Sequence, residues 1–248
     1  MLKFELVQTD KHSIKILLRR KNLRFLRRTN HIQNRCLQLK NRTKLKNLNF
    51  ETILKDAGKF TLTENDSYIQ TYPEFLKYFE NLNAGEINEH NLIIASHFVY
   101  GWMPTIIHLD LEYKDKVLFL LNAAKSGHIL NVSELEILKK AINNSLVGLS
   151  KLLHFINPRD YAIWDSRIFR YITEKKSSYG IDRPELYLDY LNGIKNVSKN
   201  KDYGNLHELI AKNFDYEIYP TRVIEITMFE TDRNKQNRLR KITVGNIS

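Results

Sequence analysis

Apolar residues recur three and four positions apart over most of the chain from Phe50 onward, which is the spacing of one face of an α-helix. The segment "SELEILKKAI" at residues 133–142 is typical, with apolar residues at its third, sixth and tenth positions. Alternating patterns are rare: "MLKFELV" at residues 1–7 and "FDYEIY" at residues 214–219 alternate weakly, as strands or extended segments do. The pattern predicts a mostly α fold.

Proline and capping residues predict where these helices begin and end. Proline lacks an amide proton and disfavours helical geometry at the residue before it, so each proline is expected at a helix boundary. The five prolines are Pro73, Pro104, Pro158, Pro184 and Pro220. Ser133 followed by Glu136 predicts an N-cap with a capping box. Gly127 predicts a left-handed end to the helix over "KVLFLLNAAKS", and "NLHELIAKNF" predicts a short late helix.

The positive charge is concentrated near the N-terminus. The chain has 248 residues and a formal net charge of +11. Thirteen Lys or Arg and no Asp or Glu lie between Lys11 and Phe50, so the other residues together carry +11 − 13 = −2. No internal repeat and no Pro- or Gly-rich linker divides the chain after Phe50. We therefore expect a basic N-terminal arm at residues 1–49 and one helical domain at residues 50–248.

The basic arm favours an anionic partner. Its cations can neutralise phosphates and release counterions, which favours nucleic acid. The candidate phosphate-binding residues are Arg19, Arg20, Arg24, Arg27 and Arg28. Apolar residues between them also suit an amphipathic helix on an anionic membrane, and a solvated segment unrelated to the domain is a third possibility.

Composition argues against several classes of protein. No run of eighteen apolar residues and no signal-peptide pattern is present, so a membrane partner is not expected and the predicted location is cytoplasmic, with nucleoid association in a bacterium. A single Cys36 excludes an intramolecular disulfide, a thiolate zinc cage and a four-cysteine iron–sulfur site. Neither a metal nor a cofactor is expected.

The most informative stretch is "VGLSKLLHFINPRDYAIWDSRIFRYI", from Val147 to Ile172. Helical spacing places Lys151 and His154 on one face, and Pro158 must end their helix. Asp165 then precedes "SRIFRYI" as a strong N-cap candidate. Lys151 alone is most simply a surface lysine whose stem lies along apolar neighbours. The cap at Asp165 is compatible with a second role, because an anion fixed at a helix N-terminus can stabilise a cationic transition state.

This stretch resembles the helix-hairpin-helix DNA glycosylases, most closely their 8-oxoguanine DNA glycosylase-like and archaeal 8-oxoguanine glycosylase branches. In those families a lysine on one helix is followed by a proline-containing loop and by "VDSR" or "VDxH" at the next helix N-terminus; here "IWDSR" stands in that place. The resemblance covers about 25 of 248 residues. It implies a helical glycosylase-like domain in which Lys151 is the catalytic lysine and Asp165 the catalytic aspartate. Gly148 in "LVGLSK" takes the place of the hairpin that binds a DNA phosphate.

The activity that the resemblance implies is a DNA glycosylase/AP lyase acting on double-stranded DNA with a damaged or modified base, such as 8-oxoguanine. The base is turned out of the duplex, and Lys151 displaces it from the sugar and forms a Schiff base. Only the neutral amine can attack. Because an ordinary lysine has a pKa near 10.4, burial or a cationic neighbour must lower the pKa of Lys151.

The base-binding pocket is less sharply predicted. Candidate pocket residues are Phe98, Trp102, His154 and Trp164. The simpler role of the three aromatic residues is a place in the core, and that of His154 is a hydrogen bond to a backbone carbonyl. Arg167 is a candidate clamp for a phosphate or carboxylate. Arg222 and Glu225 are three apart on a predicted helix and most simply pair with each other.

Two other classes of function stay open at this point. A non-catalytic nucleic-acid-binding helical protein would explain the charge of the arm but not the lysine–aspartate arrangement. A nuclease using His154 and Asp165 lacks a second carboxylate nearby in the sequence for a two-metal site. A covalent adduct with damaged DNA would separate the glycosylase from both.

Overall fold

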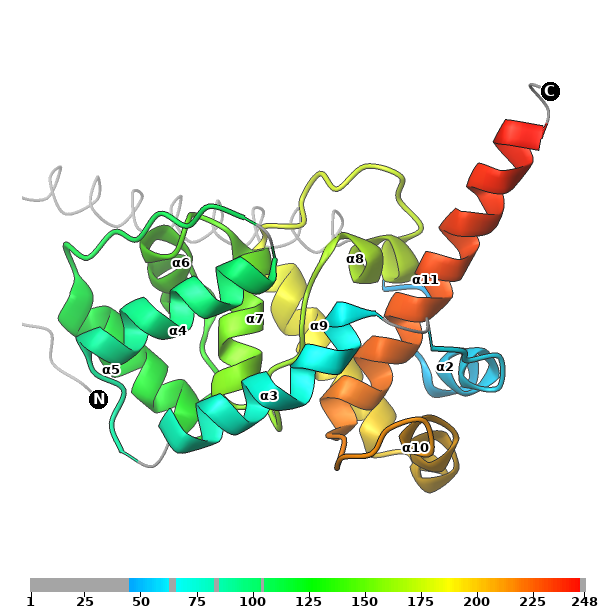
Figure 1. The fold of residues 1–248 in the computed structure, drawn as a ribbon, viewed down its shortest axis with the longest axis horizontal. Helices are drawn as coiled ribbons and strands as arrows, with labels where there is room; N and C mark the ends of the chain where they lie inside the picture. Colours follow the sequence, from blue (N-terminus) through cyan, green and yellow to red (C-terminus); the bar gives the residue numbers. More distant parts are fainter. Residues whose placement is uncertain (1–44, 63–65, 83–84, 104, 246–248) are drawn as a thin grey trace, which may run out of the picture. The chain divides into compact units, whose positions relative to one another are not determined.

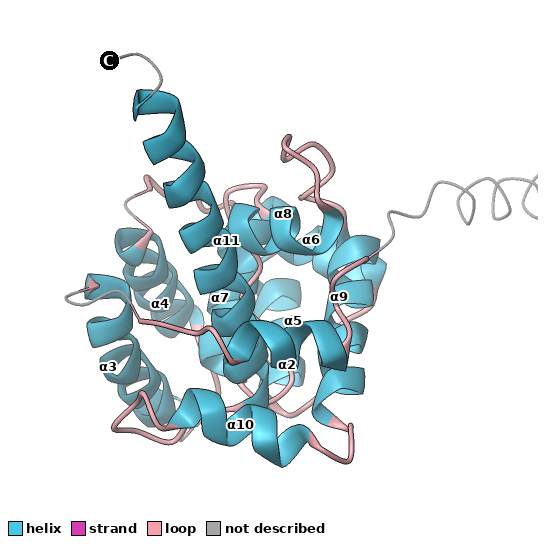
Figure 2. Cartoon of the chain, turned by 90° about the vertical axis from the view of Figure 1, so that its right-hand side faces the viewer, coloured by secondary structure: helices cyan, strands magenta, loops and turns pink. Residues whose placement is uncertain are grey.

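The computed structural model describes residues 45–62, 66–82, 85–103 and 105–245. In this part of the chain there are ten helices and no β-strand, which confirms the mostly α prediction (Figures 1 and 2). The helices are α2 (Phe50–Ala57), α3 (Ser67–Leu82), α4 (Glu89–Trp102), α5 (Lys114–Lys125), α6 (Val132–Ala141), α7 (Leu146–Ile156), α8 (Ser166–Thr173), α9 (Pro184–Ser198), α10 (Tyr203–Ala211) and α11 (Pro220–Gly245). None of them is long and apolar enough to cross a membrane.

The described residues before Phe50 contact the helical unit. The amide of Lys46 donates to the carbonyl oxygen of Ile172 at 2.8 Å, and the side-chain amide of Asn47 donates to the carbonyl oxygen of Tyr171 at 2.7 Å. These contacts tie the segment before α2 to α8. The five candidate phosphate-binding arginines of the arm and the segment "MLKFELV" lie outside the described residues.

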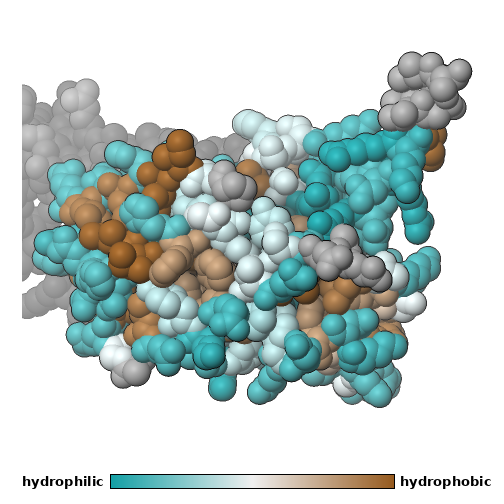
Figure 3. All heavy atoms as spheres, viewed as in Figure 1, coloured by the Kyte–Doolittle hydropathy of each residue, from teal (hydrophilic) through white to brown (hydrophobic). Residues whose placement is uncertain are grey.

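Helix α7 lies at the centre of the unit and packs against α3, α4, α5 and α6 (Figure 1). Nine of its eleven residues are buried, as expected of an apolar helix surrounded on all sides. The long helix α11 packs against α2, α8, α9 and α10. Its C-terminal end extends past the other helices, and its surface there is hydrophilic (Figures 1 and 3).

Most of the predicted helix ends are confirmed. Helix α7 ends at Ile156, immediately before Asn157-Pro158, and α9 and α11 begin at Pro184 and Pro220. Gly127, just after α5, has a φ of +92°, a conformation that glycine adopts without strain. Pro104 lies outside the described residues.

Three local predictions are wrong. Pro73 lies inside α3 instead of preceding it: the helix begins earlier, where Asp66 accepts from the amide of Tyr68 at 2.9 Å, and burial of Tyr72 and Phe79 holds both halves on the core. The residues "FDYEIY" form a loop between α10 and α11 rather than a strand.

The third correction concerns the N-cap of α6. The cap is Asn131, not Ser133. The side-chain oxygen of Asn131 accepts from the amides of Ser133 and Glu134 at 3.0 and 3.1 Å, and the carboxylate of Glu134 accepts from the amide of Asn131 at 2.8 Å. Both possible caps have a glutamate three residues later, so the pattern alone could not separate them.

A candidate active site between α7, α8 and α11

The residue before Lys151 fixes the loop that leads to Asp165. Ser150 is fully buried, and its hydroxyl accepts from the amide of Trp164 at 3.0 Å and lies 3.2 Å from the carbonyl oxygen of the same residue. These bonds join the middle of α7 to the residue just before the N-cap of α8. Lys151 and Asp165 are therefore held near each other although fourteen residues separate them.

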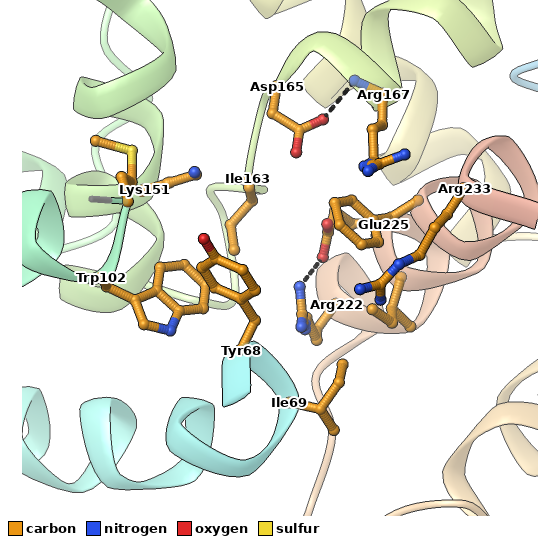
Figure 4. Close-up of a pocket in the computed structure, with 13 residues that line it drawn as sticks. Tyr68, Ile69, Trp102, Lys151, Ile163, Asp165, Arg167, Arg222, Glu225 and Arg233 are labelled. Carbon is orange, nitrogen blue, oxygen red and sulfur yellow. Dashed lines mark hydrogen bonds and ion pairs between the residues drawn. The ribbon is translucent and has the colours of Figure 1, made fainter. Parts of the chain in front are cut away.

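Lys151 and Asp165 line the same pocket, which has a volume of about 240 Å³ (Figure 4). The charged residues of its wall are Lys151, Asp165, Arg167, Arg222, Glu225 and Arg233. Its aromatic residues are Tyr68, Trp102 and Phe229. The walls come from α3, α4, α7, α8 and α11, so the pocket exists only in the folded chain.

Asp165 is the N-cap of α8, as predicted. One carboxylate oxygen, Oδ1, accepts from the amides of Arg167 and Ile168, each at 2.9 Å. The carboxylate faces the same space as the amine of Lys151 (Figure 4). Two backbone donors thus fix its position at the helix terminus, where the dipole favours negative charge.

Lys151 is only partly exposed, and its Nζ lies 5.6 Å from the centre of the Trp102 ring. Burial lowers the pKa of its amine below the ordinary value, and the attraction of Asp165 and Glu225 opposes this shift without cancelling it. Within the described residues no ion pair joins Lys151 to Asp165. The amine is therefore not a solvated surface lysine and is not neutralised by direct contact with the aspartate.

Arg222 and Glu225 form the predicted ion pair on α11, and both are almost fully buried. Burial raises the pKa of Glu225 to about 7, although the positive charge of Arg222 acts in the opposite direction. The Nε of Arg222 has no hydrogen-bond partner within the described part of the chain. Sequence reasoning found this pair but not its place in the pocket. The signal in the sequence was a pair of opposite charges, Arg222 and Glu225, at the start of the mostly apolar segment "RVIEITMF".

Of the four predicted pocket residues, the structure brings Trp102 to the pocket. Its indole nitrogen donates to the hydroxyl of Thr71 at 3.0 Å. Phe98 is 48% exposed on α4 and packs against Tyr78 outside the pocket. Trp164 is a core residue, fully buried, whose indole nitrogen donates to the carbonyl oxygen of Ile181 at 2.8 Å.

His154 also lies outside the pocket, in the core. Its Nδ1 is 2.7 Å from the carbonyl oxygen of Tyr161, so this nitrogen carries the proton, and its Nε2 accepts from the hydroxyl of Tyr72 at 2.7 Å. Burial lowers the pKa of the imidazole to about 3. His154 is therefore neutral at physiological pH and connects three parts of the core.

Helices α6 and α7 form a hairpin, but its backbone cannot bind a phosphate at Gly148. Asn143 and Asn144 make the turn with φ values of +57° and +48°. Gly148 is buried, a Cβ on it would lie 2.0 Å from the hydroxyl of Tyr100, and its amide donates to Ser145. The expected phosphate contact at Gly148 is thus excluded by packing.

Arg167 lies on the wall of the pocket, as a clamp for an anion would. Its guanidinium is 5.2 Å from the centre of the Phe229 ring, and one nitrogen is 3.9 Å from the carboxylate of Asp232. The long distance to Asp232 leaves Arg167 able to contact a further anion.

Comparison with known proteins gave no match: no protein-family model, no curated protein and no solved structure is significantly similar to this chain.

Proposed function

We propose that the chain is a DNA glycosylase/AP lyase that excises a damaged or modified, 8-oxoguanine-like base from double-stranded DNA through a Schiff base on Lys151. The observation that carries the proposal is the meeting of Lys151 and Asp165 in one pocket, where burial lowers the pKa of the amine. An amine that need not first give up a strong ion pair can act as a nucleophile. The resemblance of "SKLLHFINPRDYAIWDSRI" to the glycosylases names the same two residues.

In the proposed reaction the target nucleotide is turned out of the duplex into the pocket. The lone pair of Nζ forms a bond to C1′ of the sugar, and the bond from C1′ to the base breaks, with its electron pair leaving on the base. Asp165 stabilises the positive charge that develops on the sugar. The amine then loses a proton, the bond from C1′ to the ring oxygen breaks and that oxygen takes up a proton, which leaves a Schiff base between Nζ and C1′. Loss of a proton from C2′ then expels the 3′ phosphate by β-elimination and breaks the strand.

The rest of the pocket suits a flat, polar ligand. Trp102 and Tyr68 pack edge to face, with ring centres 5.3 Å apart, and form an aromatic wall on one side. Phe229 lies on α11 across the pocket. The buried Arg222–Glu225 pair offers both donors and acceptors to the edge of a base, and the Nε of Arg222 has no partner within the described residues to occupy it. Aromatic faces with polar groups at the edge are what a flipped base requires.

Borohydride trapping tests the proposal. A Schiff base reduced in its presence links the protein covalently to DNA, so the full chain is incubated with duplexes that each carry one lesion, 8-oxoguanine among them. We expect an adduct with at least one duplex and none after Lys151→Gln. Lys201→Gln, which removes an exposed lysine far from the pocket, is the matched control and should trap like the wild type.

Two results would contradict the proposal. Binding to every duplex without any adduct would favour the non-catalytic nucleic-acid-binding alternative. An adduct that survives Lys151→Gln would place the reactive amine elsewhere in the chain.

A further inference from the structure

In the hairpin between α6 and α7, two amides at the start of α7 already have acceptors in the chain. The amide of Leu146, in the first turn of α7, donates to the carboxylate of Asp182 at 2.9 Å, and the amide of Gly148 donates to the hydroxyl of Ser145. A carboxylate already occupies the position where an anion would bind a helix N-terminus. A phosphate there would meet the negative charge of Asp182 instead of free amides. If the protein holds DNA, another surface must hold the strand beside the pocket.

We propose that the groove between α8 and the C-terminal half of α11, here called the basic groove, binds the phosphodiester backbone of one DNA strand and leads it to the pocket. The groove has a volume of about 600 Å³. Its six cations are Arg167, Arg170, Lys175, Lys176, Lys235 and Arg240, against two carboxylates, Glu174 and Asp232, so its net charge is 6 − 2 = +4. The inference rests on the proposed function only for the reaction in the pocket, and not for the binding of DNA in the groove.

Both carboxylates of the basic groove are already engaged by cations. Asp232 accepts from Arg170 at 2.7 Å, and Glu174 accepts at 2.8 Å from Lys46, which is not part of the groove wall. An incoming anion therefore meets a surface whose excess charge is positive. Lys235 and Arg240 are exposed on α11, where their side chains can reach a phosphate without breaking a buried contact.

The basic groove and the pocket share a wall residue, Arg167. It lies two residues after Asp165. In Figure 4 its side chain lies between Asp165 and the first half of α11, and in Figure 3 the hydrophilic surface continues along the exposed end of that helix. A strand in the groove would place one of its nucleotides next to the Lys151 amine.

The length of the groove fits a run of phosphates. The groove residues of α11 run from Asp232 to Arg240, over which the helix advances about 12 Å at 1.5 Å per residue. A strand of B-form DNA carries one phosphate per 3.4 Å along the duplex axis, so this length corresponds to about three or four phosphates. The groove wall contains no aromatic residue among its described members. The groove is therefore not suited to stacking unpaired bases. Contact through charge alone fits the phosphodiester backbone of DNA of any sequence.

The test compares two double variants of the full chain with the same change in charge. Lys235→Glu/Arg240→Glu alters the basic groove, and Lys201→Glu/Lys212→Glu alters exposed lysines near α10. The dissociation constant for an undamaged duplex is measured by fluorescence anisotropy over a series of salt concentrations. For the groove variant we expect binding to be weaker by at least about tenfold and the slope of log K against log salt to fall by about two, because each lost phosphate contact removes about 0.9. The control should stay within about twofold of the wild type.

Equal weakening in both variants would overturn the proposal, because it would reflect net charge alone. Unchanged DNA binding in the groove variant would also overturn the proposal. Displacement of the duplex by a polyglutamate peptide at equal charge concentration would overturn it too, because an acidic protein would then be the better occupant of the groove. Borohydride trapping of the same proteins separates this inference from the proposed function. If the wild type traps and both variants bind DNA equally well, the groove proposal is refuted and the glycosylase proposal is not. If the groove variant selectively loses DNA binding but the wild type never traps, the glycosylase proposal is refuted and the groove proposal is not.

Discussion

Two positions on α7 show how similar burial leaves two nearby ionisable residues in different surroundings. Lys151 and His154 are three residues apart on this helix, and burial lowers the pKa of both. His154 faces the core, where both ring nitrogens have partners at 2.7 Å. Lys151 faces the pocket, where its amine lies over an aromatic ring and near a carboxylate that it does not contact directly. Under the proposed function, of these two lowered pKa values only the one beside a cavity serves a reaction.

Removing each of these two side chains in turn gives the largest effects. Lys151→Gln should abolish trapping and leave the free energy of unfolding within about 1 kcal/mol, because a partly exposed charge is removed. His154→Ala should lower the free energy of unfolding by about 3–5 kcal/mol, because it leaves a cavity and two buried polar partners unsatisfied. Urea unfolding followed by circular dichroism measures stability, and trapping by the folded fraction measures reactivity. A stable His154→Ala variant that cannot trap would reverse the assignment.

Asp165→Asn sharpens the comparison on the pocket side. Asparagine also caps helices well, so α8 should keep its start and the stability should change by a few tenths of a kcal/mol. The rate of trapping should fall by about 10²–10³, because the negative charge facing the sugar is lost. Single-turnover kinetics on the best lesion duplex measure this rate. Asp165→Ala is the control for the cap: it should lose about 1 kcal/mol of stability in addition. If the trapping rate falls only in proportion to the loss of stability in Asp165→Asn and Asp165→Ala, then Asp165 is a structural residue.

The pH dependence of stability compares a core residue, His154, with a pocket residue, Glu225. The pKa of His154 falls from 6.5 to about 3 on folding. The unfolded chain therefore binds more protons between these values, and this residue makes stability rise with pH over that window. The pKa of Glu225 rises from 4.5 to about 7 on folding, so the native state binds more protons there and stability falls as pH rises from 4.5 to 7. The two contributions oppose each other between pH 4.5 and 6.5.

Glu225→Gln should remove one of these opposing contributions. Relative to the wild type, the stability of the variant should increase with pH from 4.5 to 7, by up to about 1.4 kcal/mol per pH unit. Urea unfolding of both proteins at several pH values measures the difference, in which the other ionisable groups cancel. Parallel pH curves would show that Glu225 has the same pKa in the folded and unfolded chain.

The sequence predicted the features that depend on neighbouring residues. The end of α7 before Pro158 and the cap of α8 at Asp165 follow from local backbone chemistry, and with them the proximity of Lys151. Arg222 was paired correctly with Glu225, because both lie on one helix. Their position near Lys151 depends on how α11 packs against α8 and α9. This packing cannot be predicted from a local sequence pattern.

The errors have the same physical origin. Pro73 was expected to start a helix because of its own backbone, yet burial of the neighbouring Tyr72 keeps it inside α3. Gly148 was expected to contact a phosphate because of its place in the motif, yet the ring of Tyr100 fills the space beside it. In both cases a contact from a distant part of the chain outweighed the local preference.

The hydrogen bonds between Ser150 and the backbone of Trp164 have a consequence for recognising chains with a similar pocket. They hold the two ends of a loop together, and Tyr161 inside the loop is fully buried, so residues can be added at the exposed turn of Arg159 and Asp160 while the ends stay in register. The count of residues from lysine to aspartate can then vary while Lys151 and Asp165 stay in one pocket. A search that fixes this count would miss chains with the same arrangement, and a search for the small hydroxyl residue before the lysine would find them.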